Sequence, residues 1–141
     1  TYGEVSAGTT GHAEAVPVHY DPERASYQAL LEVFWRKFDP TDAGGQFVDR
    51  GSQYRGAIFY HDDEQKAIAE KVIKDLEAQK VWDDPIVTTL EKMETFYIAE
   101  DYHQEYFANN PFQPYCAAVV RPKVVKFRKQ YMDMLKKEGA V

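Results

Sequence analysis

The sequence is poor in several features that whole classes of protein require. It has a single cysteine, Cys116, so no disulfide can form within the chain, and the lone thiol favours a reducing compartment, the cytoplasm. No apolar run approaches the roughly 20 residues that a membrane-spanning helix needs. The net charge is −6, without the basic patch of a nucleic-acid-binding surface. We therefore expect neither a membrane nor a nucleic acid among the partners.

The remaining composition is that of a globular protein. The 141 residues are 44% hydrophobic and 14% aromatic, which is enough for one domain with a core. The N-terminal residues 1–11 are expected to form an extended segment or loop. Period-2 and period-3.6 patterns predict strands over 13–20, 56–60, 86–90 and 95–98, and helices over 27–38, 63–80, 100–109 and 124–135. This mixture predicts an α+β fold, a two-layer α/β sandwich of ferredoxin-like type with helices packed on a mixed sheet.

Two helix starts carry clear capping signals. Ser26 is a good N-cap for the first helix, and Asp62 with Gln65 forms the pattern of a capping box for the second. The first helix has an apolar stripe that we expect to face the core, and Trp35 lies off it. The stripe consists of Tyr27, Leu30, Leu31, Phe34 and Phe38.

One acidic residue stands out on the first predicted strand. Alternation along Ala13–Tyr20 puts Glu14 on the same face as Val16 and Val18. A carboxylate on a core face is costly unless it is hydrogen-bonded or protonated, so we expect a raised pKa. Glu14 could then serve as a proton donor at neutral pH.

A polar stretch leads into the second predicted strand. Residues 41–53 form a long glycine-containing loop, a type of loop that is often functional in small domains. Its end places the acid Asp49 and the phenol Tyr54 close together at the mouth of an apolar strand, where a rigid scaffold can support a site.

Several motifs together resemble one family, the A-type peptide methionine sulfoxide reductases. They occur in the family's order along residues 1–129. The motifs are Thr10-Gly11-His12-Ala13-Glu14, Tyr20-Asp21-Pro22, Phe38-Asp39-Pro40-Thr41, Asp49-Arg50-Gly51-Ser52-Gln53-Tyr54-Arg55, Ala99-Glu100-Asp101-Tyr102-His103-Gln104, Asn110-Pro111 and Tyr115-Cys116.

The resemblance implies an oxidoreductase that repairs oxidised proteins under oxidative stress. Its members reduce the S epimer of methionine sulfoxide, in proteins or free, by attack of a cysteine thiolate on the sulfoxide sulfur. By motif match Glu14 protonates the leaving oxygen, and Asp49, Tyr54 and Tyr2 complete its pocket. The reductant is external, thioredoxin or another thiol, and no bound cofactor or metal is expected. The four histidines show no ligand spacing with cysteines, so His12 and His103 are expected to be structural.

The sequence departs from the family at the nucleophile. The Gly-Cys-Phe-Trp-Gly motif that carries it is absent, so we expect a single reductase domain over 1–141 that is incomplete at its N-terminus. The nucleophile is then expected on a segment outside this sequence, and the chain alone is expected to be inactive. Cys116 could be the resolving thiol or, equally, a small buried apolar residue. The alternative to an enzyme is a non-catalytic domain that binds methionine sulfoxide peptides.

Overall fold

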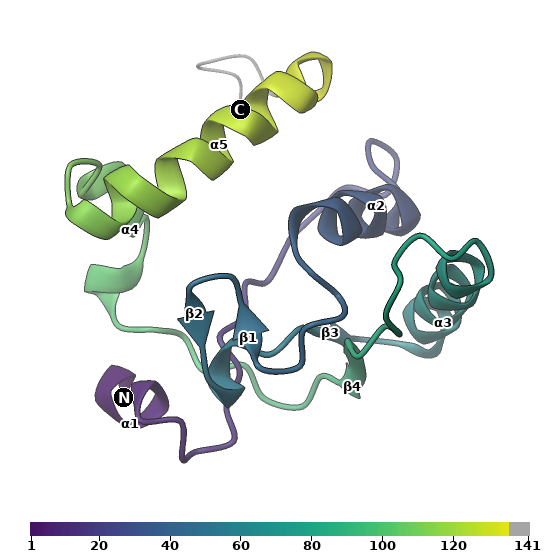
Figure 1. The fold of residues 1–141 in the computed structure, drawn as a ribbon, viewed down its shortest axis with the longest axis horizontal. Coiled ribbons are helices and arrows are strands. Elements are labelled where there is room, and N and C mark those ends of the chain that lie inside the picture. The colour runs from purple at the N-terminus through teal and green to yellow at the C-terminus, as the bar shows by residue number, and fades with distance from the viewer. Residues whose placement is uncertain (136–141) are drawn as a thin grey trace. The chain divides into compact units, whose positions relative to one another are not determined.

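The computed structural model describes residues 1–135 (Figure 1). The chain divides into two compact units, Thr1–Ile98 and Ala99–Val141. Both helices and β-strands occur in the first unit, and helical turns dominate the second. The class is therefore α+β, as predicted.

The core of the first unit lies between two helices and a pair of strands. Helix α2 (Tyr27–Lys37) packs against α3 (Asp63–Ala78). Helix α3 also contacts the strands β3 (Ala57–Tyr60) and β4 (Thr89–Lys92) (Figure 1). The buried residues of this core are Leu31, Trp35, Ile58 and Ala69.

Both predicted helix starts are confirmed. The Ser26 hydroxyl accepts a hydrogen bond from Ala29 N at 3.0 Å, and the Asp62 carboxylate accepts one from Gln65 N at 2.7 Å. The Gln65 side chain reaches back one residue beyond the cap and accepts a bond from His61 N at 2.8 Å. The two capping bonds, to Ser26 and Asp62, satisfy backbone donors that helix geometry leaves unpaired.

The expectation for Trp35 was wrong. Its side chain is only 4% exposed, since it stacks on Phe38 with ring centroids 5.7 Å apart and lies 6.4 Å from the ring of Trp82. Leu31 and Trp35 are one helical turn apart and are both buried, so they mark the centre of the buried face of α2. The face is wider than the predicted stripe because the segment around Trp82 also packs against it.

The strands form two small sheets. Strand β3 (Ala57–Tyr60), predicted from its apolar run, pairs in parallel with β4 (Thr89–Lys92). The latter begins at Thr89 rather than at the predicted Ile86. A second pair, β1 (Gly45–Gln46) and β2 (Asp49–Arg50), forms an antiparallel hairpin inside the predicted loop.

Two predicted strands are absent from the part of the chain that the structure describes. Residues 13–20 form an irregular segment in which Val16 and Val18 are 82% and 63% exposed, so there is no core face. Pro17 lacks a donor for a ladder, which opposes pairing there. Residues 95–98 likewise pair with no strand, and Ile98 is 79% exposed.

Three predictions that concern helical segments also need correction. The segment 1–11, predicted as extended or loop, contains a short helix α1 (Tyr2–Ser6). The predicted helix 100–109 is broken by Glu105, whose φ is +50°, into a 3-10 turn (Asp101–His103) and α4 (Tyr106–Asn109). The last helix starts early, as a π-helical turn (Cys116–Val120) that continues into α5 (Arg121–Gln130) and a 3-10 turn (Met132–Met134).

Candidate functional site

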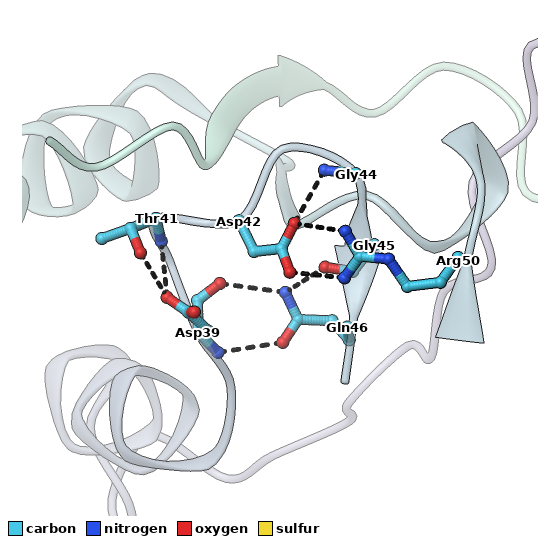
Figure 2. Close-up of polar contacts among 7 residues, drawn as sticks. All are labelled: Asp39, Thr41, Asp42, Gly44, Gly45, Gln46 and Arg50. Atoms are coloured by element: carbon cyan, nitrogen blue, oxygen red, sulfur yellow. Dashed lines mark hydrogen bonds and ion pairs between the residues drawn. The ribbon is translucent and has the colours of Figure 1, made fainter. Parts of the chain in front are cut away.

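The loop before Asp49 is held by a dense set of side-chain bonds (Figure 2). The Gln46 amide pairs with the backbone of Asp39: its Oε1 accepts from Asp39 N at 2.9 Å and its Nε2 donates to Asp39 O at 2.9 Å. The Arg50 guanidinium forms a two-bond pair with the Asp42 carboxylate, with one N–O distance of 2.9 Å. These bonds tie the hairpin to the chain that follows α2.

This hairpin fixes the position of Asp49. Asp49 lies on β2 directly opposite Gln46, and Gly51 N donates to Gly44 O at 2.9 Å just beyond the strand. Gly51 then turns the chain with φ +136° and ψ 161°, a conformation essentially restricted to glycine. The 3-10 turn Ser52–Tyr54 follows at once, so Asp49 and Tyr54 belong to one short rigid segment.

Gln53 joins this segment to the N-terminal residues. Its side chain is buried, and Nε2 donates to Ser6 O at 3.1 Å, at the end of α1. Its backbone carbonyl accepts a 2.7 Å bond from Glu14 N. Tyr2 on α1 and Glu14 are thereby brought beside Tyr54, although about 40–50 residues separate them in the chain.

Glu14, Asp49 and Tyr2 all lie near enough to Tyr54 to influence the pKa of its phenol. Partial burial raises the pKa of its phenol above the ordinary 10.0, and the nearby ionisable groups of Glu14, Asp49 and Tyr2 raise this pKa further. A phenol with a pKa of 10 or above is protonated at neutral pH, so it can donate a hydrogen bond. The arrangement thus offers carboxyl groups and phenols to one small acceptor.

The setting of Glu14 differs from the expected one. The residue is exposed and lies outside any described strand, so the expectation of a carboxylate on a core face was wrong. The alternation of Val16 and Val18 was misleading because, in the described structure, this segment belongs to no sheet and is joined to Gln53 by a backbone bond from Glu14 N.

The remaining candidates lie apart from this group in the sequence. Cys116 belongs to the second unit, where it is 1% exposed and its N–H donates to Gln113 Oε1 at 3.2 Å. His12 packs edge-on against Tyr97 with centroids 5.2 Å apart, and His103 Nε2 lies 3.5 Å from a Glu100 carboxylate oxygen.

The described residues show neither a metal-binding cluster nor a membrane-spanning helix. Within residues 1–135, no group of three or more His, Cys, Asp or Glu side chains could hold a metal ion. None of the helices described there is long and apolar enough to cross a membrane.

The sequence reasoning missed the role of Gln53. A glutamine between Gly51 and Tyr54 gives no signal of burial, because glutamine is usually exposed. Only the two long-range bonds from Gln53 identify it.

Comparisons with known proteins place this geometry in context. The model of the family described as peptide methionine sulfoxide reductase matches residues 1–135. The chain is 47% identical over 135 residues to a peptide methionine sulfoxide reductase MsrA of Polynucleobacter asymbioticus, covering 96% of this chain and 71% of that protein. It is 49% identical over 135 residues to an MsrA of Deinococcus radiodurans, covering 96% of this chain and 66% of that one.

Solved structures agree with these relatives. The crystal structure of reduced Mxr1 from Saccharomyces cerevisiae superposes with a TM-score of 0.73 at 36% identity, over 80% of this chain and 61% of that one. The methionine sulfoxide reductase A of Corynebacterium diphtheriae gives a TM-score of 0.66 at 32% identity, over 80% and 58% of the two chains.

Proposed function

The chain belongs to the peptide methionine sulfoxide reductase family, and we propose that it provides the sulfoxide-binding and proton-donating part of such an enzyme. The reaction is the thiol-dependent reduction of the S epimer of methionine sulfoxide, in proteins or free, to methionine. The observation that carries this proposal is the placement of Glu14, Asp49 and Tyr2 near the Tyr54 phenol, supported by the bonds that join Gln53 to Glu14 N and Ser6 O.

The chemistry of a sulfoxide explains why these groups suit it. Its oxygen is a good hydrogen-bond acceptor but a poor leaving group, so it must receive a proton as the S–O bond breaks. From the family resemblance we assign that proton to the carboxyl group of Glu14, and the hydrogen bonds that hold the oxygen to the phenols of Tyr54 and Tyr2. Burial of the Tyr54 phenol raises its pKa, and the nearby Asp49 carboxylate adds to this shift.

The reaction also needs a nucleophile and a reductant. A cysteine thiolate attacks the sulfoxide sulfur, the methionine sulfur gains two electrons, and the cysteine becomes a sulfenic acid. Two further thiol groups then return it to the thiol with release of water, and we propose thioredoxin or another cytoplasmic thiol reductant as their source.

We place the nucleophile on a segment outside these 141 residues. Cys116 is the sole cysteine and is buried, whereas a nucleophilic thiolate must be accessible. The chain spans only 71% and 66% of the first two relatives, which leaves room for such a segment in those proteins.

A resolving role for Cys116 would require the thiol to become exposed during turnover. Alkylation with iodoacetamide tests this role directly. Labelling of the native chain within minutes supports a resolving thiol, and labelling only in denaturant supports the buried apolar role.

The buried Cys116 also favours a second candidate, a domain that binds methionine sulfoxide peptides without turnover. Dithiothreitol-driven reduction of a chiral sulfoxide, assayed with the protein purified from its source and with the 141-residue chain, separates the two. Activity of the former, at a mass above 16.3 kDa, supports the enzyme. Sulfoxide binding without turnover at a mass of 16.3 kDa supports the binding domain, and turnover by the chain alone that Cys116→Ser abolishes would contradict an external nucleophile.

A further inference from the structure

We propose that Gln53 is a positioning residue whose buried amide holds the helix that carries Tyr2 against the segment that carries Asp49 and Tyr54. Its influence on a bound sulfoxide then passes through Tyr2. This inference rests on the proposed function and adds to it a residue that contacts no substrate.

The contacts of Gln53 make it the junction of three segments. The side chain is 7% exposed, its Nε2 donates to Ser6 O at 3.1 Å, and its backbone carbonyl accepts from Glu14 N at 2.7 Å. Removal of the side-chain amide therefore affects the Ser6 bond, while the backbone bond to Glu14 can persist. The side-chain amide of Gln53 therefore holds α1, whereas its backbone carbonyl holds Glu14.

Helix α1 depends on such a tether. It has five residues, far fewer than an isolated helix needs in water. Tyr2 is 54% exposed, so burial of its ring contributes little to fixing the helix. Ser52 Oγ also reaches this region, through a 3.3 Å bond to Gly8 O, but that bond is exposed and weaker in geometry.

The amide oxygen of Gln53 indicates that this side chain positions its neighbours rather than adding stability. Gln53 Oε1 is buried and has no hydrogen-bond partner among the described residues. It faces Gly8 and Gly51, and a Cβ at Gly8 would come within 3.2 Å of it. A buried acceptor without a partner lowers stability, so an apolar side chain would serve a purely structural position better. The donating Nε2 is the reason to keep glutamine here.

A double-mutant cycle tests the inference. The variants are Gln53→Met, which keeps length and apolar volume without the amide, Tyr2→Phe, and the two combined. The matched control is Gln46→Met, the same chemical change at an amide that bonds the Asp39 backbone in the preceding hairpin. The readout is the Kd for a peptide containing one (S)-methionine sulfoxide, compared with the same peptide containing methionine.

The unaltered chain should prefer the sulfoxide peptide. Gln53→Met and Tyr2→Phe should each weaken this binding about tenfold, the equivalent of one hydrogen bond. The double variant should be no weaker than either single variant, because both changes remove the same contribution. The effects of Gln46→Met and Tyr2→Phe on the Kd should instead multiply when the two changes are combined. Hydrogen exchange of the backbone amides of residues 5–8 should accelerate in Gln53→Met and not in Gln46→Met.

The outcomes separate this inference from the proposed function. Two results, each with sulfoxide preference in the unaltered chain, would overturn the role of Gln53 and leave the proposed function standing. In one, the Kd effects of Gln53→Met and Tyr2→Phe multiply, and in the other, Gln53→Met leaves the hydrogen exchange of residues 5–8 unchanged. Equal binding of both peptides by the unaltered chain would overturn the proposed function, and the role of Gln53 in it. Where Gln53→Met does not fold, Gln53→Asn is measured in its place, since it keeps the amide but is one methylene too short to reach Ser6 O.

Discussion

Substitution of Gly45 by alanine should damage both stability and the site. Gly45 lies on β1 with φ +141° and pairs with Arg50 of β2. An added Cβ would fall inside van der Waals contact of the Asp49 carbonyl oxygen and 3.0 Å from Arg50 Cα. Both are backbone atoms, so the clash can be relieved only if the two strands separate, and Asp49 would move with β2.

The magnitude follows from two costs. A non-glycine residue in this region of φ costs about 1–3 kcal/mol, and an overpacked contact costs about 1–3 kcal/mol more. Together they remove about 2–6 kcal/mol from a free energy of unfolding that is usually about 5–15 kcal/mol. Gly11→Ala is the matched control, because Gly11 also has a positive φ, +76°, but no atom lies within 4 Å of its added Cβ. It should cost only about 1–2 kcal/mol.

Urea unfolding followed by far-ultraviolet circular dichroism measures both variants. Gly45→Ala should lower the midpoint well below that of Gly11→Ala, and it should also weaken binding of the sulfoxide peptide. Equal free energies of unfolding for the two variants would refute the steric reasoning. Loss of stability without any loss of sulfoxide binding would refute the link between the hairpin and Asp49.

Three further predictions concern the site and the core. In a preparation that reduces methionine sulfoxide, Glu14→Gln should lower the single-turnover rate about 10²–10⁴-fold, as expected for loss of a general acid, and a near-normal rate would remove Glu14 from the mechanism. The Tyr54 phenol should titrate above pH 10, and Asp49→Asn should lower the pKa of Tyr54, as monitored by ¹³C NMR of the tyrosine ring. Because the pKa is raised in the folded state, the stability linked to this phenol is present below pH 10 and is lost as the pH rises through the raised value. Leu31→Ala should cost about 2–5 kcal/mol of unfolding free energy in urea, since the side chain is 4% exposed in the core.

Local signals in the sequence predicted the parts of the fold that local interactions decide. The caps Ser26 and Asp62 were correct because each bonds a donor three residues away. The apolar run of β3 was correct because its burial against α3 agrees with its composition. Trp35 was misplaced because the width of a buried helix face depends on neighbours, here Trp82, that no helical period can include.

Motif order suggested the candidate residues of the site but not how the fold brings them together. It named Glu14, Asp49, Tyr54 and Tyr2 as candidates, whereas periodicity placed Glu14 on a strand that is not formed. Side chains point to alternating sides of any extended segment, whether or not a partner strand is present. The alternation along residues 13–20 therefore carried no information on strand pairing. The residue that assembles the group, Gln53, acts through bonds across 39 and 47 positions of sequence, which no local window contains.

The bond between Gln53 and Ser6 has a consequence for how the protein acquires and loses its site. It closes a loop of 47 residues, and the entropy of that closure must be met before the contact contributes anything. The pairing of α2 with α3 and of β3 with β4 involves neither partner of this bond. The N-terminal segment can therefore detach in a local opening while the core stays folded, and it should join last during folding. Such a protein would lose affinity for its ligand at a lower temperature than the one at which its helices melt.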